Sequence, residues 1–404
     1  MGGLQEDYSI MKIKYSIIIP SLNGLEGLKV TLPYMLSIDR NDFEIVVSDN
    51  CSTDGLWEYL SGINNPKLKI FKTKKRLPHS KHLNFAYSKS SGEWIGHIGD
   101  DDLILKNRFD VLDSITNGCE LVVGSSLRYV WKDHTVEPEN SIGIEDFGIY
   151  SLECDSIKGI DYYQKLINRV NISGGGCWMV NRKVYKKVVD KFGYFSPDTA
   201  NVEFFSLRAS AYFSKKVTRI DYPLFVNGRM NKSSGTTLHE HNSDIFDWSF
   251  ENPGGGWHYC PIPTYSYCTI SLDAALRVDT VLQTNTFSNI AWGKNCMGAF
   301  LYKAYGVDST NSQPKITTLF YSIVVNYPIG SLYILFRRAA GSMYFWIKSL
   351  FCEVNIGVRY DFVTYTKSRE YLKGDFLGVS SIVDFADWYI DYNERILKSI
   401  KKRG

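Results

Sequence analysis

The 404-residue chain lacks the patterns that mark several common classes of protein. None of its eight cysteines forms a Cys-x-x-Cys pair or has a histidine at the spacing of a zinc site, which excludes the usual zinc-binding modules. The net charge is only +3 and there is no long basic block, so nucleic acid is not an expected partner. With 44% hydrophobic and 22% charged residues, the composition is that of an ordinary globular protein and not of a disordered or collagenous one.

The start of the chain lacks recognisable targeting features. Residues 1–10 do not contain the apolar core of a signal peptide. Glu6 stands where an N-myristoylation signal requires serine or threonine. Several cysteines lie in apolar stretches and are expected to be buried, reduced thiols. These features predict a cytoplasmic protein.

In the segment WIGHIGDDDLIL, from Trp94 to Leu105, an apolar run ends on three consecutive acids, Asp100, Asp101 and Asp102. Ionised carboxylates are costly to bury without partners, so the strand must end there. At the carboxyl end of a strand in an α/β sheet, clustered acids favour a divalent cation that carries an anionic ligand. The alternative is a cap for the helical segment that follows, for which one aspartate would suffice.

From Tyr15 onward, short β-rich runs alternate with amphipathic segments, which predicts an α/β fold with a largely parallel sheet covered by helices. Strands are expected at residues 15–19, 44–47, 68–71, 94–98, 121–123, 179–181 and 217–221. Helices are expected at residues 25–36, 56–61, 82–89, 103–114, 183–189 and 202–213. A boundary is expected near residue 230, because the aromatic-rich remainder lacks strand alternation and is predicted to be mainly helical.

Polar turns follow the first two predicted strands. Asn23 lies in IIIPSLNG and Asp49 lies in VVSDNCSTDG. Because parallel strands bring their carboxyl ends to one edge of the sheet, these turns and the acidic cluster are expected on one rim. Each turn alone has an ordinary structural explanation, but three at one edge favour a ligand site.

The ordered motifs IIIPSLNG, VVSDNCSTDG and HSKHLNFAYSKSSGEWIGHIGDDD resemble those of the family 2 glycosyltransferases, which have the GT-A fold. The resemblance implies a flexible tail at 1–13, a Rossmann-like catalytic domain at 14–230 that binds a nucleoside diphosphate sugar, and a mainly helical region at 231–404. It also implies inversion at the transferred sugar, and UDP as the nucleotide.

The resemblance assigns roles to individual residues at the rim. Those that contact the nucleotide sugar are Pro20, Ser21, Asn23, Asp49, Arg76, Ser80, Asp100 and Asp101, with Asp49 bonded to the base and Asp100 facing the ribose or sugar. Asp101 and Asp102 are the expected carboxylates for Mg²⁺ or Mn²⁺, which stabilises charge on the leaving diphosphate. The family usually has an acid immediately before Asp100, and here Gly99 replaces it.

A general base must take the proton of the acceptor hydroxyl. In the segment GYFSPDTANVEFFSLRA, the resemblance favours Asp198 as this base and offers Glu203 as the alternative. The structural explanation of Asp198 is that it caps the helix that follows.

Downstream residues are candidates for the acceptor and the metal. Gly174, Gly175 and Gly176 are predicted to form a floor under the acceptor, and Trp178 either stacks on a sugar or packs in the core. In SSGTTLHEH, His239 and His241 either complete the metal shell or belong to a surface loop; His239 is the predicted ligand.

The C-terminal region raises the question of a membrane. Residues 316–336 are uncharged, but Pro328 and Gly330 interrupt the run, so a transmembrane span is not expected. Residues 329–351 combine apolar helical spacing with Arg337, Arg338 and Lys348, which suits a helix at an anionic membrane surface. A helix packed on the protein or a contact in a homo-oligomer is the alternative.

Together these features predict an inverting, metal-dependent transferase that moves a hexosyl or N-acetylhexosaminyl unit to a glycan or lipid-linked saccharide in bacterial surface polysaccharide synthesis. It would be cytoplasmic, with a peripheral position on the inner face of the plasma membrane if residues 329–351 bind lipid. One alternative is a nucleotidyltransferase, although IIIPSLNG is a poor glycine-rich phosphate loop. The other is a non-catalytic carbohydrate-binding protein of the same fold, against which the intact acids argue.

Overall fold

The computed structural model describes residues 12–134, 138–143, 154–167, 175–198, 202–231, 267–284, 286 and 371–401. Several predicted features lie outside these residues, namely most of the 1–13 tail, Gly174, His239, His241 and the segments at 316–336 and 329–351. In the described part of the chain, no helix is both long enough and apolar enough to cross a membrane.

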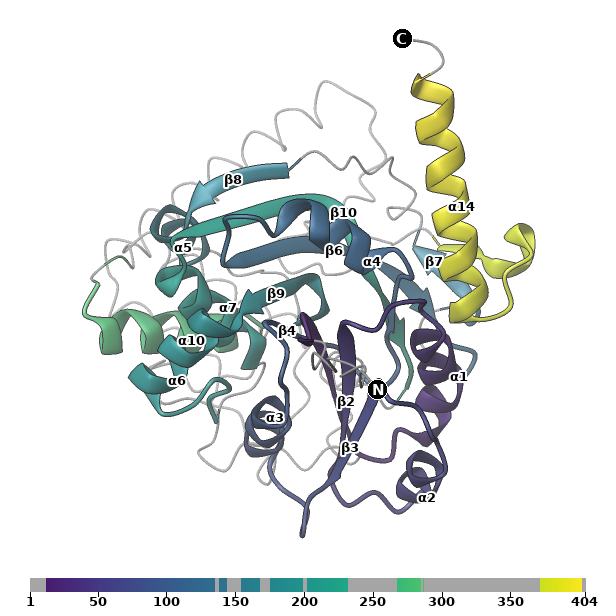
Figure 1. The fold of residues 1–404 in the computed structure, drawn as a ribbon, viewed down its shortest axis with the longest axis horizontal. Coiled ribbons are helices and arrows are strands. Elements are labelled where there is room, and N and C mark those ends of the chain that lie inside the picture. Colours follow the sequence, from purple (N-terminus) through teal and green to yellow (C-terminus); the bar gives the residue numbers. More distant parts are fainter. Residues whose placement is uncertain are drawn as a thin grey trace, which may run out of the picture.

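The N-terminal half of the sheet is parallel and consists of four strands in the order β4-β1-β2-β3 (Figure 1). These strands are β1 (Tyr15–Ser21), β2 (Phe43–Asp49), β3 (Leu68–Lys72) and β4 (Trp94–His97). Their connections contain α1 (Leu25–Leu36), α2 (Leu56–Ser61) and α3 (His79–Ser88). The apolar runs of β1 and β2 are buried on both faces, which is why they do not alternate with polar residues.

The sheet continues beyond β4 with antiparallel pairs. β9 (Trp178–Asn181) joins β4 to β6 (Leu121–Val130), and β7 (Ser141–Gly143) and β11 (Tyr371–Lys373) extend this edge. The long strand β10 (Lys216–Arg229) runs parallel to β6 and also pairs with β5 (Leu103–Ile104) and β8 (Cys154–Lys158). The predicted α/β fold of GT-A type is therefore confirmed, with the parallel order in the half that carries the rim.

Helices cover both faces of the sheet and form two apolar cores. One core contains side chains of α1, α4 (Arg108–Ile115) and α14 (Ile382–Lys401). The other contains side chains of α3, α5 (Gly159–Ile167), α6 (Arg182–Phe192), α7 (Val202–Phe213) and α10 (Tyr267–Leu282). Figure 1 shows α14 beside α1, a contact between the two ends of the chain.

Two predicted elements are wrong because of long-range pairing. The helix expected at 103–114 begins only at Arg108, because Leu103 and Ile104 pair with Val226 and Phe225 of β10. The strand expected to be the last, at 217–221, is followed by β11. The domain division near residue 230 stays a prediction, but α10, β11 and α14 all pack on the α/β domain.

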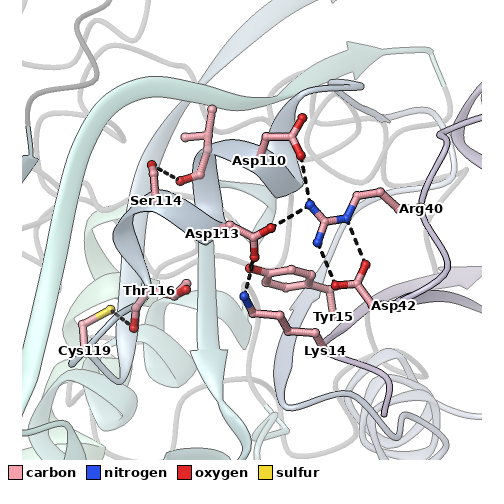
Figure 2. Close-up of polar contacts among 10 residues, drawn as sticks. Lys14, Tyr15, Arg40, Asp42, Asp110, Asp113, Ser114, Thr116 and Cys119 are labelled. Carbon is pink, nitrogen blue, oxygen red and sulfur yellow. Dashed lines mark hydrogen bonds and ion pairs between the residues drawn. The ribbon is translucent and has the colours of Figure 1, made fainter. Parts of the chain in front are cut away.

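At the amino end of β1, an ion-pair network holds the helix that follows the acidic turn (Figure 2). Arg40 bonds Asp42 and also reaches two acids of α4, with Nη1 at 2.9 Å from Asp110 Oδ1 and 2.7 Å from Asp113 Oδ2. The phenol of Tyr15 and the ammonium of Lys14 also bond Asp113. This network fixes α4 at the edge of the sheet opposite the rim.

A buried histidine joins α3 to β2 close to the rim. His82 is 3% exposed, and its Nε2 lies 2.8 Å from Ser48 Oγ. Burial, aided by the charge of His79, lowers the pKa of His82 to about 4. The imidazole is therefore neutral in the folded protein at pH values where it is protonated in the unfolded chain.

We expect the free energy of unfolding to fall as the pH drops from about 6.5 toward 4, because the unfolded state then binds a proton that folded His82 excludes. The full effect is about 3 kcal/mol, at about 1.4 kcal/mol per pH unit. Urea unfolding across this range, compared with His82→Gln, measures it. Equal slopes in the two proteins would contradict this assignment.

Candidate active site

The carboxyl ends of the parallel strands bring three polar side chains side by side. Ser21 at the end of β1 pairs in register with Asp49 at the end of β2, and Asp49 pairs with Lys72 at the end of β3. On the other side of β1, Ile18 pairs with His97, the last residue of β4, and the acidic turn follows. The structure thus places the predicted rim residues at one edge of the sheet.

The loops after β1 and β2 are bonded to each other. Asn23 has a φ of 58°, a left-handed conformation that asparagine tolerates better than most residues. Its Oδ1 accepts a hydrogen bond of 2.8 Å from Thr53 N, and its own N–H donates to Ser52 Oγ. Asp54 accepts from Leu25 N at the start of α1. Asn23 is exposed, and it sets the shape of the rim through these bonds.

Asp49 is enclosed at the end of β2, and its two carboxylate oxygens have different surroundings. The residue is 0% exposed, and its Oδ1 accepts a 2.8 Å hydrogen bond from Ser52 N. Its Oδ2 is buried and accepts no hydrogen bond from the described residues, while Lys72 Nζ lies 3.6 Å away. A buried acceptor without a hydrogen-bond donor is costly, and here the ion pair with Lys72 offsets part of that cost.

Asn50 holds the loop that carries Arg76. Its side chain donates to Leu77 O and accepts from Leu77 N, both at 2.8 Å. Arg76 is exposed on this loop. Ser80, in the first turn of α3, is only 2% exposed, which leaves little surface for the ligand contact expected of it.

The acidic turn is fixed through Asp102. Its carboxylate accepts hydrogen bonds from Gly99 N (2.7 Å), Gly228 N (2.9 Å) and the Asn227 amide (3.2 Å). Burial raises the pKa of Asp102 to about 7, the charge of Asp100 adds to the rise, and these hydrogen bonds oppose it. Asp102 therefore has a structural task in joining the turn to β10.

Asp100 and Asp101 fit a divalent cation better than Asp102 does. Asp100 accepts a 2.5 Å hydrogen bond from Ser21 Oγ at the rim. A Cβ at Gly99 would lie only 2.7 Å from Asp101 Oδ1 and 3.2 Å from Asp102 Oδ2, so the missing side chain lets both carboxylates pack closely against this glycine. No group of three or more acids, histidines or cysteines among the described residues is arranged to hold a metal alone. Two carboxylates suffice for Mg²⁺ when substrate phosphates supply further ligands. Asp101 and Asp102 as the metal ligands stay a prediction, and the three N–H partners of Asp102 favour Asp100 in its place.

Three glycines allow the chain to approach the acidic turn. A Cβ at Gly24 would lie 1.9 Å from Asp100 Oδ2, and one at Gly27 would lie 2.5 Å from the Asp100 carbonyl oxygen. A Cβ at Gly228 would lie 1.9 Å from the Asp101 carbonyl oxygen. Gly24 belongs to the IIIPSLNG motif, but nothing near Gly228 in the sequence links it to this turn.

The two candidate bases have different surroundings. Glu203, in the first turn of α7, lies with Oε1 3.3 Å from His97 Nε2, next to the acidic turn. Asp198 is 42% exposed at its side chain and is paired with Arg277 of α10, at 3.2 Å. This arrangement favours Glu203 over Asp198, the base preferred from sequence.

Glu203 is held in its ionised form. Burial raises the pKa of Glu203, but the hydrogen bond and charge of His97 and the charge of His79 outweigh burial and hold the pKa below its usual value. Sequence reasoning missed His97, because its position beside Glu203 depends on how the fold places α7 relative to the end of β4.

Two residues of the predicted acceptor site, Gly176 and Trp178, are buried in the core. Trp178 has no exposed surface and lies against His97 and Phe195, so of the two roles considered for it the structure supports packing in the core. Gly175 and Gly176 belong to a short 3₁₀ turn before β9. A Cβ at Gly176 would lie 2.4 Å from the Phe225 ring, so this glycine permits close packing, and no free surface for an acceptor is found at it.

Comparison with known families and curated proteins gives one consistent match. Residues 16–189 match the model of glycosyl transferase family 2. An uncharacterized glycosyltransferase of Rickettsia conorii is 29% identical over 143 residues, which are 32% of this chain and 23% of that protein. An uncharacterized glycosyltransferase of Rickettsia bellii is 28% identical over 99 residues, 24% of this chain and 14% of that protein. The aligned part thus spans less than a quarter of either relative.

Two solved structures of residues 1–349 of TarS from S. aureus are also similar. One is 16% identical with a TM-score of 0.43 and covers 80% of this chain and 91% of that chain. The other, a complex with UDP-GlcNAc, is 15% identical with a TM-score of 0.44 and covers 80% and 92%. Both superpose too loosely to bear on the ligand of this chain.

We expect Gly228→Ala to lower the free energy of unfolding by about 1–3 kcal/mol, because the new Cβ displaces the Asp101 carbonyl and with it the bonds of Asp102. Gly62→Ala is the matched control: it has φ −81°, and a Cβ there meets only ordinary contacts of 3.5 Å or more. Urea unfolding of both variants measures the difference. Equal stability of the two would show that the turn does not depend on this close approach.

Proposed function

Since the chain belongs, through residues 16–189, to glycosyl transferase family 2, we propose that it is an inverting glycosyltransferase. It transfers a hexosyl or N-acetylhexosaminyl unit from a nucleoside diphosphate sugar, with UDP as the nucleotide, to a hydroxyl group. The acceptor is a glycan or a lipid-linked saccharide in bacterial surface polysaccharide synthesis. The observation that carries the proposal is the convergence of Asp49, the acidic turn and Glu203 at one edge of the sheet.

In this proposal the donor lies along the rim. An N–H group of the base donates to Oδ2 of Asp49, beside the Lys72 ammonium, and Pro20, Ser21 and Asn23 border the nucleoside. The diphosphate then extends toward the acidic turn, with Arg76 on the loop beside it. The length of the rim between β2 and β4 thus separates the base from the reacting sugar.

Asp100 and Asp101 would hold Mg²⁺ or Mn²⁺. When bound, the cation stabilises the negative charge that gathers on the diphosphate as it leaves. Asp102 keeps the turn in place through its three N–H partners.

Glu203 acts as the general base. Its carboxylate takes the acceptor proton as the oxygen attacks the anomeric carbon, and a single displacement with one base inverts that carbon. His97 keeps Glu203 ionised, so the base is ready at neutral pH. Asp198, paired with Arg277, instead supports the loop before α7.

The two other classes fit less well. A nucleotidyltransferase needs a glycine-rich phosphate loop after its first strand, and here the loop is shaped by Asn23, whose side chain is bonded to Thr53. A non-catalytic binding protein has no use for an ionised carboxylate held next to the donor, as Glu203 is. The membrane surface, the homo-oligomer and the cytoplasmic location remain proposals from the sequence at 329–351 and its cysteines.

We expect the protein to release nucleoside diphosphate from at least one donor in a panel of UDP-linked sugars, with Mn²⁺ or Mg²⁺ required. Asp101→Asn should lower kcat/KM by about 100-fold or more, because a metal ligand is lost. Asp110→Asn is the control, an exposed acid of α4 away from the rim. A turnover rate that neither a chelator nor Asp101→Asn changes would contradict the metal assignment.

Glu203→Gln should lower kcat by about 10²–10⁴-fold with little change in donor KM, because only proton removal is affected. Asp198→Asn should reduce kcat much less, since its partner is Arg277. Steady-state kinetics with a saturating acceptor separates the two. The reverse order of effects would identify Asp198 as the base.

A further inference from the structure

Three side chains from separate elements form a hydrogen-bonded row that ends at Glu203. Tyr87 of α3 has its hydroxyl 2.6 Å from His97 Nδ1, and His97 Nε2 lies 3.3 Å from Glu203 Oε1. Tyr87 is 1% exposed and His97 is 6% exposed, whereas the Glu203 side chain is 29% exposed. The row therefore runs from the core to the edge of the site, and only its last member can meet a substrate.

The proton positions in this row follow from its two ends. Glu203 is ionised because its pKa lies below the usual value, so its carboxylate can only accept. Burial and the neighbouring Glu203 and Tyr185 raise the pKa of Tyr87 well above its usual value, so its phenol keeps its proton. Because the carboxylate can only accept, His97 Nε2 carries the hydrogen of this bond in both the protonated and the neutral ring. In the neutral ring Nδ1 then accepts from Tyr87.

Aromatic neighbours fix the imidazole ring. His97 meets Trp178 edge-on at 5.9 Å and 82°, and meets Tyr87 at 5.7 Å and 73°. Trp178 is itself fully buried, and Phe195 packs against both Trp178 and Tyr87. A ring held in this way cannot swing toward a substrate, so its role must pass through Glu203.

The other titratable groups near Glu203 are few. His79, at the start of α3, acts on Glu203 with a charge that lowers its pKa. Cys177, before β9, has its pKa raised to about 12 by burial and remains a neutral thiol. Tyr185, on α6, is likewise protonated, because burial raises its pKa. His97 is hydrogen-bonded to the Glu203 carboxylate, with Nε2 3.3 Å from Oε1.

We propose that His97 is a positioning residue for the general base: it orients Glu203 through Nε2–H, and Tyr87 fixes the tautomer that makes this bond. The inference rests on the proposed function and deepens it. The bond engages Oε1 and leaves Oε2 to take the acceptor proton. In that step the acceptor O–H bond breaks, the bond from acceptor oxygen to anomeric carbon forms, and the bond to the diphosphate breaks with its electron pair on the diphosphate.

The test compares three variants of the full-length protein. His97→Leu removes the donor, His97→Gln places an amide N–H near the position of Nε2–H, and Tyr87→Phe removes only the phenol that sets the tautomer. Tyr163→Phe is the control, because Tyr163 is also a buried tyrosine but its hydroxyl bonds Thr284. The readouts are kcat, donor KM and the pH dependence of kcat.

We expect His97→Leu to lower kcat by about 10- to 100-fold, part of the contribution of a general base, with donor KM unchanged. The acid limb of the pH profile should move to higher pH, because burial then raises the pKa of Glu203 without opposition from His97. His97→Gln should recover most of the kcat that His97→Leu loses. Tyr87→Phe should move the acid limb to higher pH by a smaller amount. Tyr163→Phe should change neither kcat nor the acid limb.

An unchanged acid limb in both His97→Leu and Tyr87→Phe would overturn the inference, as would a loss of kcat in His97→Leu that His97→Gln does not recover. If His97→Leu fails to fold, Tyr87→Phe and His97→Gln decide. If the wild-type protein turns over no donor, the proposed function fails. The inference is then decided by NMR titration of the Glu203 carboxyl, whose pKa must rise in Tyr87→Phe.

Discussion

The structure of the site depends on the hydrogen bonds of one buried carboxylate. Asp102 accepts from Gly99 N in its own turn and from Gly228 N in β10, so it joins the end of β4 to a strand that lies far along the chain. These bonds offset much of the cost of burying a charge. Because Asp102 is engaged in this way, the backbone of its neighbours Asp100 and Asp101 is fixed, and Asp100 accepts a hydrogen bond from Ser21 at the rim.

Around this turn, each half of the site is supported by a different part of the fold. The parallel strands align Ser21, Asp49 and Lys72 along the rim, and this follows directly from their register. The base is held from the other side, where α7 packs on α5, α6 and α10 and places Glu203 against His97. The C-terminal elements α10, β11 and α14 pack on the same α/β domain, so they contribute to its stability as well as covering it.

Much of the parallel half could be predicted from sequence, because local patterns suffice there. The predicted bounds of α1, α2 and α7 match the structure, and β1 to β4 lie where the apolar runs indicated. The failures involve contacts between distant segments. Leu103 and Ile104 have helical spacing but pair with β10. Trp178 is a residue type that can stack on sugars, but it lies in a core with side chains of α3 and α7. Glu203 could not be preferred over Asp198 without knowing that His97 faces one and Arg277 the other.

We propose that a nucleoside diphosphate lies along the edge of the sheet from Asp49 to the acidic turn, and the roles of the other site residues follow from this position. A crystal structure of the protein with UDP and Mn²⁺ tests this directly. We predict a hydrogen bond from the base to Asp49 Oδ2, the diphosphate beside Asp100 and Asp101, and no metal contact from Asp102. Nucleotide bound elsewhere, or a base that does not reach Asp49, would contradict the account.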